Sequence, residues 1–262
     1  MMEQVNVKQH FRADEAPFID QVNDWLTTAG DQYRPVLTAF LNPRQRYIMR
    51  VIANRQDEVK VAFKGAYPGA EMQRGLAYPA YYQPTEDDFE LQLLEINYPQ
   101  KFAELHHRQV MGAVLSTGVE RGAFGDIIAS DEHWQIIVQR QLSDYLIEQV
   151  TSIGKAKVRL EKRELQGARA PQEDWQELVT TVASLRLDAV VAASFNYSRN
   201  RAKQLIERGQ VRVNWEEIDR PDYELASRDL ISVRHGGRIK VQEELGQNRH
   251  ERTRIRLAII HA

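Results

Sequence analysis

Hydrophobic residues in the first 82 positions recur first at helix spacing and then at strand spacing. One apolar stripe with a period near 3.6 residues consists of Phe18, Ile19, Val22, Trp25 and Leu26. Asn42 and Pro43 mark the start of a second helix, because Asn caps helix N-termini and Pro fits the first helical position. Residues 58–63, EVKVAF, alternate as a strand does. We predict an N-terminal α/β domain over residues 1–82.

The middle of the chain has the order strand, helix, strand, strand, helix, strand. The strands are expected at 88–99, 125–130, 133–139 and 155–161, the helices at 102–118 and 142–154, and a turn at 131–132. This order predicts a ferredoxin-like (RRM-like) βαββαβ domain over residues 83–164. Its last strand offers Lys155, Lys157 and Arg159 instead of the aromatic signature that stacks bases. Any RNA contact of this domain would therefore use charge and shape.

The last third of the chain begins after a polar stretch, residues 165–184, that we interpret as a linker. In the domain that follows, residues 185–262, Ser198 caps a helix over 199–208 and Gly209 ends it. Ala202, Leu205 and Ile206 form its apolar stripe. Residues 210–215, QVRVNW, then alternate as a strand. Together the three domains predict an α+β protein.

Composition excludes several classes of protein. No apolar run approaches the roughly 18 residues of a membrane span, and the N-terminus has no apolar signal-peptide core. We therefore expect a cytoplasmic protein without a membrane partner. The absence of cysteine excludes disulfides, thiolate catalysis and thiolate zinc sites. No phosphate-loop or dinucleotide fingerprint is present, so no cofactor is expected.

The net charge of −2 conceals an asymmetry. Residues 186–262 hold 15 Lys and Arg against 11 Asp and Glu, whereas the rest of the chain holds 20 against 26. A basic unit on an acidic body indicates a polyanion partner, the alternative being an ordinary solvated arginine-rich surface.

The predicted helix at 199–208 carries cations on both flanks of its apolar stripe. Arg199 and Lys203 lie on one flank and Arg201 and Arg208 on the other. Cations in a first helical turn are disfavoured unless an anion joins them, and we predict that this anion is an RNA phosphate. The predicted RNA-binding residues are Arg186, Arg199, Arg201, Lys203, Arg208 and Arg212.

The residues of this basic unit resemble the S4 RNA-binding domain. The resemblance rests on RLDAVVAASFNYSRNRAKQLIERGQVRVN at 186–214, on Pro221 and on DLISVR at 229–234. Trp215 and Arg228 depart from the pattern, because most S4 domains carry glycine at these two positions, so the loop geometry there is in question.

Nearly the full length resembles the YlmH family of bacterial S4-domain proteins. The resemblance rests on SFNYSR, VNW and GGRIKV in the last domain, on HHRQVMGAVLSTGVERGAFGDI at 106–127 and on FLNPRQRYI at 40–48. The resemblance implies a non-catalytic adaptor that binds rRNA of the large ribosomal subunit, near retained peptidyl-tRNA, in the rescue of stalled ribosomes. No DNA partner is expected. The alternatives are an RNA-modifying enzyme targeted by its S4 domain and a division-associated protein scaffold.

Other candidate residues favour structural roles. His106 and His107 are adjacent, which is poor geometry for a shared metal, and no metal site is predicted. Asp126 follows a tight turn, where a packing role is favoured over acid–base chemistry. Asp188 is expected to pair with a nearby Arg, because its RLD sequence lacks the Thr-Gly-Leu continuation of pseudouridine synthases.

Overall fold

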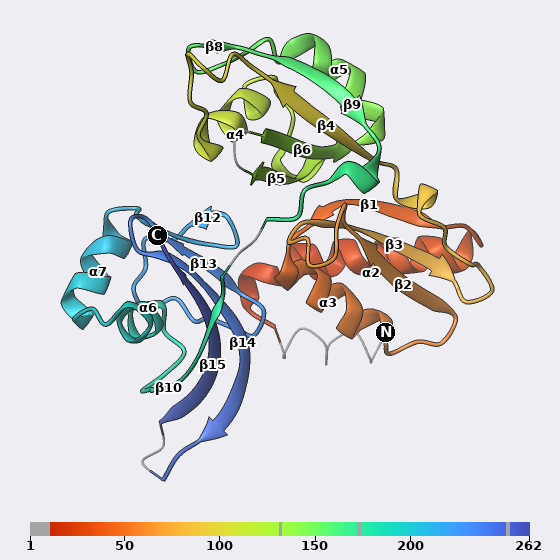
Figure 1. Cartoon of the computed structure of the whole chain (residues 1–262). Coiled ribbons are helices and arrows are strands. Elements are labelled where there is room, and N and C mark those ends of the chain that lie inside the picture. Colours follow the sequence, from red (N-terminus) through yellow and green to blue (C-terminus); the bar gives the residue numbers. More distant parts are fainter. Residues whose placement is uncertain (1–10, 131–132, 172–173, 250–251) are drawn as a thin grey trace. The chain divides into compact units, whose positions relative to one another are not determined.

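The computed structural model describes residues 11–130, 133–171, 174–249 and 252–262. The chain forms two compact units, Met1–Pro171 and Gln172–Ala262 (Figure 1). The first unit contains both predicted domains that precede the polar stretch at 165–184. None of the described helices has an apolar stretch long enough to cross a bilayer.

The first part of unit one is a three-stranded antiparallel sheet packed against two helices. Its elements are η1 (Ala13–Glu15), α2 (Ala16–Asp31), β1 (Val36–Leu41), α3 (Pro43–Ala53), β2 (Val59–Lys64) and β3 (Gln73–Pro79). The strand order is β1-β3-β2. Ile19 and Val22 of α2, which belong to the predicted apolar stripe, share one core with Ile48 and Met49 of α3. Asn42 caps α3, and its side chain accepts a hydrogen bond from the Gln45 N–H.

A buried ion pair fixes the start of α3 to the start of α2. Arg44, only 5% exposed, donates from Nε and Nη2 to the two carboxylate oxygens of Glu15 at 2.8 and 2.9 Å. The Arg12 guanidinium donates to the same carboxylate at 2.8 Å. Burial alone would raise the pKa of Glu15, but the hydrogen bond from Arg44 and the charges of both arginines outweigh it and lower the pKa below 4.5.

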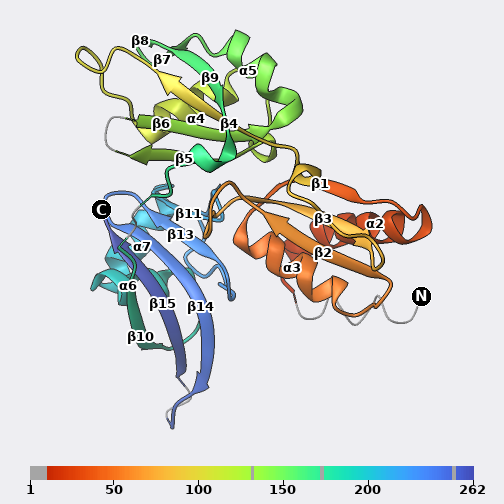
Figure 2. The same ribbon diagram turned by 45° about the vertical axis from the view of Figure 1, so that its right-hand side comes forward.

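The second part of unit one has the predicted ferredoxin-like order. Its main elements are β4 (Leu91–Asn97), α4 (His107–Leu115), β5 (Phe124–Ser130), β6 (His133–Gln139), α5 (Ser143–Gln149) and β9 (Arg159–Arg163). Shorter elements are η2 (Asp87–Phe89), η3 (Arg121–Ala123), η4 (Arg140–Leu142), β7 (Ser152–Ile153), β8 (Ala156–Lys157) and η5 (Leu165–Gly167). The sheet has the antiparallel order β5-β6-β4-β9, and α4 and α5 cover one of its faces (Figure 2).

Both helices of this part are shorter than the sequence predicted. Helix α4 begins at His107, and residues 98–106 form a loop with a Pro99-centred turn. Helix α5 ends at Gln149, because β7 and β8 form a small hairpin whose turn contains Gly154 at φ 57°. The predicted turn at 131–132 lies outside the described residues.

Asp126 joins the two parts of unit one. Its carboxylate accepts hydrogen bonds from Tyr67 Oη at 2.8 Å and from the backbone N–H groups of Glu71 and Met72 at 2.9 and 3.0 Å. These partners lie in the loop between β2 and β3, so Asp126 holds that loop against β5. The predicted packing role is confirmed.

Unit two is a six-stranded antiparallel sheet with two helices. Its elements are β10 (Gln176–Val182), α6 (Leu187–Phe195), α7 (Arg199–Glu207), β11 (Val211–Val213), β12 (Glu216–Glu217), β13 (Leu230–Val233), β14 (Gly237–Gln247) and β15 (Thr253–His261). The order is β10-β15-β14-β13-β11-β12. Strand β10 falls within the segment predicted as a linker, yet it pairs with β15 over its full length. Its β-branched residues were a strand signal, and their pairing partner lies some 75 positions later.

Replacing Glu15 by Gln is expected to lower the free energy of unfolding by about 3 kcal/mol, because a buried arginine loses its charged partner. Urea unfolding of the full chain measures the change. Glu86→Gln is the matched control, since its pair with Lys64 is exposed and should change stability by about 0.5 kcal/mol or less.

The Glu15 effect should also depend on pH with a defined sign. Because the folded-state pKa lies below the ordinary value of 4.5, ionised Glu15 stabilises the fold fully above pH 4.5 and this contribution is lost as pH falls through the folded pKa. The difference between parent and Glu15→Gln should therefore narrow in acid. A difference that is constant from pH 7 to pH 3 would contradict the ion-pair explanation.

Candidate nucleic-acid interface

Helix α7 is held on the second unit by its apolar stripe. Ala202 and Ile206 are fully buried, and Leu205 packs against the same core. The Ser198 hydroxyl accepts from the Arg201 N–H at 3.1 Å, and Gly209 follows the helix at φ 65°. The predicted cap, stripe and terminator are all confirmed. The helix therefore turns its remaining sides, which carry the cations, toward solvent.

The anion beside Arg199 belongs to the protein. Asp188 in the first turn of α6 has no solvent exposure, and Arg199 Nη2 donates to its Oδ2 at 2.7 Å. Arg186 donates to the same carboxylate from Nε and Nη2 at 3.2 and 3.3 Å. Burial opposes ionisation of Asp188, but the hydrogen bonds and charges of the two arginines prevail and lower its pKa.

This contact confirms that Asp188 pairs with arginines and corrects the explanation of the first-turn charge. The sequence predicted that an RNA phosphate compensates Arg199, whereas in the structure the Asp188 carboxylate does so. The side chains of Arg186 and Arg199 are still 40% and 48% exposed. Guanidinium groups have five N–H donors, so both arginines keep donors for a further anion.

The other predicted residues divide into one stacked and three unpaired cations. Arg201 lies over the Tyr197 ring, 3.8 Å from its centroid, and Tyr197 packs in turn against Phe195 at 5.7 Å. Lys203, Arg208 and Arg212 are exposed, and within the described part of the chain their side chains have no ion pair. On the adjacent strand, Glu217 lies directly across from Arg212.

Two aromatic partners of cations were not predicted. Tyr197 lies four residues before Arg201, a spacing at which side chains near a helix start can meet, so the sequence held a signal. Trp175 contacts Lys240 at 3.8 Å and Arg238 at 5.6 Å from its ring centroid. These partners are over sixty residues apart, and no local pattern connects them.

The two positions that depart from the S4 pattern keep the backbone that glycine would adopt. Trp215 has φ 71° and Arg228 φ 75°. Asn214 at φ 51° and Trp215 form the two-residue turn of the β11–β12 hairpin, where both central residues need positive φ. Asn214 Nδ2 donates to Asp229 Oδ1 at 2.8 Å and its Oδ1 accepts from the Leu230 N–H. Side-chain bonding by Asn214 thus supports a turn without glycine.

The remaining candidates have structural partners. His106 is the N-cap of α4, and its backbone N–H donates to Gln109 Oε1 at 3.0 Å. Across the described residues, no three His, Asp or Glu side chains lie together as a metal site would require.

A ferredoxin-like domain joined to a module with an exposed, cation-rich helix defines a multidomain RNA-binding protein. Three family models match consecutive parts: "YlmH, N-terminal" at 14–82, "Putative RNA-binding domain in YlmH" at 84–167 and "S4 domain" at 185–231. The chain belongs to the YlmH family, as its motifs predicted.

The similar proteins match either most of the chain or only a part of it. The chain is 39% identical, over 95% of its length and 97% of the relative, to the ribosome-associated protein quality control protein P2 of Bacillus subtilis (strain 168). The small ribosomal subunit protein uS4 of Fervidobacterium nodosum is 36% identical over 29% of this chain and 39% of its own. The solved cell division protein ylmH from Streptococcus pneumoniae is 33% identical, with a TM-score of 0.54 over 60% of this chain and 95% of that one.

The contact between Arg199 and Asp188 predicts that two neighbouring cations of α7 differ in their effect on stability. Arg199→Ala should lower the free energy of unfolding by about 1 kcal/mol, because a buried acceptor loses one of its two partners. Lys203→Ala should change it by about 0.5 kcal/mol or less. Thermal unfolding of both variants provides the comparison, and equal effects would contradict the structural role of Arg199.

Proposed function

We propose that this chain is a non-catalytic adaptor that docks on structured RNA of the large ribosomal subunit. The observation that supports this proposal most directly is helix α7, whose buried stripe leaves Arg201, Lys203 and Arg208 exposed on an S4 domain. Arg186, Arg199 and Arg212 complete the proposed RNA-binding set.

The exposure and the ion pairs of each cation suggest different roles within this set. Lys203, Arg208 and Arg212 are assigned to backbone phosphates, because they have charge and exposure and no ion pair within the described chain. Arg201 lies over the Tyr197 ring and is exposed, so it is assigned to a phosphate or base at this surface. Arg186 and Arg199 serve first to pair Asp188 and second as additional phosphate donors.

The names of the relatives support the cellular role. The Bacillus subtilis relative is named for ribosome-associated protein quality control, which favours a role at the ribosome. We propose that this role is the rescue of stalled ribosomes in the cytoplasm, with peptidyl-tRNA close to the bound chain. The Streptococcus pneumoniae protein is named for cell division, which agrees with the scaffold alternative. We favour the adaptor because a basic S4 surface suits RNA phosphate more directly than a protein partner.

Affinity for ribosomal RNA should fall steeply with salt. If about four to six phosphates are neutralised, the log–log slope should be on the order of −3 to −5. Arg201→Ala combined with Lys203→Ala should weaken binding and make the slope shallower by about one to two units. Arg55→Ala with Lys60→Ala removes the same charge from exposed positions of the first unit and should leave the slope unchanged. Binding that does not depend on salt would refute the phosphate contacts.

Purified chain should sediment with isolated large ribosomal subunits and much less with small ones. The Arg201→Ala, Lys203→Ala variant should lose about tenfold in bound fraction at low occupancy, whereas Arg55→Ala, Lys60→Ala should not. Equal binding to both subunits would reject the large-subunit assignment. Failure to bind either subunit would favour the protein scaffold.

A further inference from the structure

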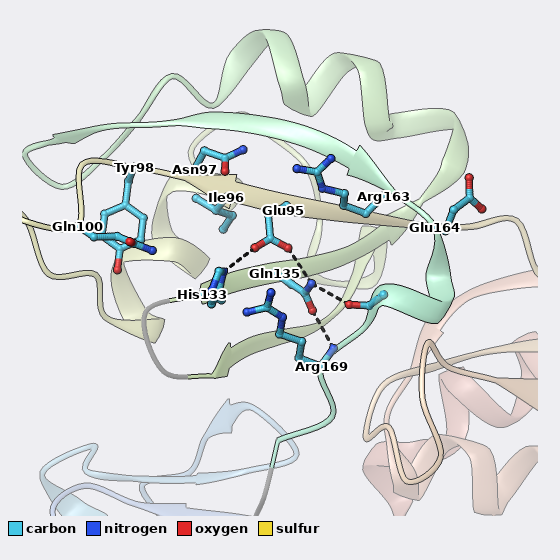
Figure 3. A pocket seen from close by; sticks show the side chains of 11 residues that line it. Glu95, Ile96, Asn97, Tyr98, Gln100, His133, Gln135, Arg163, Glu164 and Arg169 are labelled. Carbon is cyan, nitrogen blue, oxygen red and sulfur yellow. Dashed lines mark hydrogen bonds and ion pairs between the residues drawn. The ribbon is translucent and has the colours of Figure 1, made fainter.

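A cavity of about 690 Å³ lies on the sheet face that α4 and α5 leave open. Its floor consists of Glu95 and Asn97 of β4 and His133 and Gln135 of β6 (Figure 3). Tyr98 and Arg169 form two of its walls. The volume lies within the range of sites for small organic ligands, so a nucleotide-sized group can enter.

The chain itself builds one side of this cavity. After β9 the segment containing η5 folds back over the sheet, where Gln135 Nε2 donates to the Gly167 carbonyl at 3.0 Å. The Arg169 N–H donates to Gln135 Oε1 at 2.9 Å. The Arg169 side chain then extends beneath Gln135 toward His133 (Figure 3). Gln135 is 2% exposed, and its bonds hold this wall in place.

A nearly buried carboxylate stands at the centre of the floor. The Glu95 side chain is 11% exposed, and its oxygens contact Gln135 Nε2 at 2.7 Å and His133 Nδ1 at 3.2 Å. A carboxylate has about four lone-pair positions, so each oxygen can accept one further hydrogen bond. Two adjacent acceptors in a fixed plane suit a rigid ligand with two adjacent N–H donors.

The rim supplies the other groups that an RNA nucleotide requires. Tyr98 offers an aromatic ring, and Arg169 offers a cation for a phosphate. Arg163 offers a second cation, which also pairs with Glu161 at 3.0 Å. The loop that contributes Tyr98 also carries Phe102, whose side chain is 90% exposed. An exposed aromatic ring on this loop is suited to stack an unpaired base.

We propose that this cavity binds an unpaired guanine of single-stranded RNA. Guanine has N1–H and N2–H side by side, which match the two free acceptor positions of Glu95, whereas adenine and uracil lack that pair of donors. Arg163 and Arg169 contact the phosphates next to this base. The inference deepens the proposed RNA-binding function, but it does not depend on the cations of α7.

Binding of short RNAs to the full chain tests the guanine assignment. The probe is a fluorescein-labelled pentanucleotide with guanosine between uridines, compared with its adenosine and inosine counterparts by fluorescence anisotropy. Guanosine should bind about tenfold more tightly than adenosine, and inosine, which lacks the N2 amine, should lie between them. Equal binding of the three RNAs would overturn the proposal.

Substitutions test whether the preference for guanosine arises in this cavity. Glu95→Gln should abolish the preference for guanosine, because an amide cannot accept from both donors, while Glu148→Gln on α5, across the sheet, should retain it. Arg169→Ala should weaken the binding of all three RNAs. This variant is the second test if Glu95→Gln is too unstable to assay. Retention of the guanosine preference by a folded Glu95→Gln would place the site elsewhere and overturn the proposal.

Two further experiments distinguish guanine in RNA from the free nucleotide, and the cavity from the α7 surface. Free 5′-guanosine monophosphate should compete at least tenfold more weakly than the pentanucleotide, and equal competition would overturn an RNA-borne ligand in favour of a free nucleotide. Arg201→Ala with Lys203→Ala should keep the guanosine preference while losing large-subunit binding. Loss of that preference in this variant would overturn the middle-domain site, whereas unchanged subunit binding would refute only the α7 surface.

Discussion

A carboxylate without access to water must be paired by cations, and in this chain that constraint falls on Asp188. Its two partners lie on either side of α6, Arg186 just before the helix and Arg199 at the start of α7. The backbone N–H groups of Leu187 and Asp188 also donate to the Tyr223 and Pro221 carbonyls. The Asp188 carboxylate thus connects α6 to α7, and the two backbone hydrogen bonds connect α6 to residues 221–223. The basic surface of α7 depends on these contacts, because only a fixed helix presents its cations in a fixed arrangement.

The same unit tolerates unusual backbone geometry because nearby polar groups support it. Positive φ costs a non-glycine residue on the order of 1–3 kcal/mol where the surroundings do not compensate. Around Trp215 and Arg228 the compensation comes from Asp229, 1% exposed, which accepts from Asn214 Nδ2 and from the Ala226 N–H, both at 2.8 Å. The loop shape is therefore encoded by hydrogen bonds where other S4 domains use glycine. Substitution of glycine alone is no evidence that a turn has been lost.

Local patterns predicted much of the fold, and long-range pairing accounts for most of what they missed. The caps Asn42 and Ser198 and the stripe of α7 were readable because each acts within a few residues. Strand β10 was assigned to the linker despite its β-branched residues, because its partner β15 is distant in sequence. Helix α5 ends earlier than predicted because the residues that follow it form the β7–β8 hairpin. For the site, the sequence predicted the cationic positions and the pairing of Asp188 with a nearby arginine. It did not predict that Arg199 is one of those arginines, since a contact across eleven residues has no sequence period. The cavity on the middle sheet was not predicted either, because its lining residues come from segments that are far apart in the sequence.

The two proposed surfaces would recognise RNA by different physics. Cations on α7 act on phosphates, which every RNA possesses, so they supply affinity and orientation without reading sequence. A buried acceptor such as Glu95 discriminates by donor pattern, because a base that leaves it unmatched also leaves it desolvated. The acceptor and the basic helix belong to different domains, so each surface can be altered without changing the other. A chain with both surfaces can therefore bind ribosomal RNA strongly through charge and still require one particular exposed base, which neither surface could achieve alone.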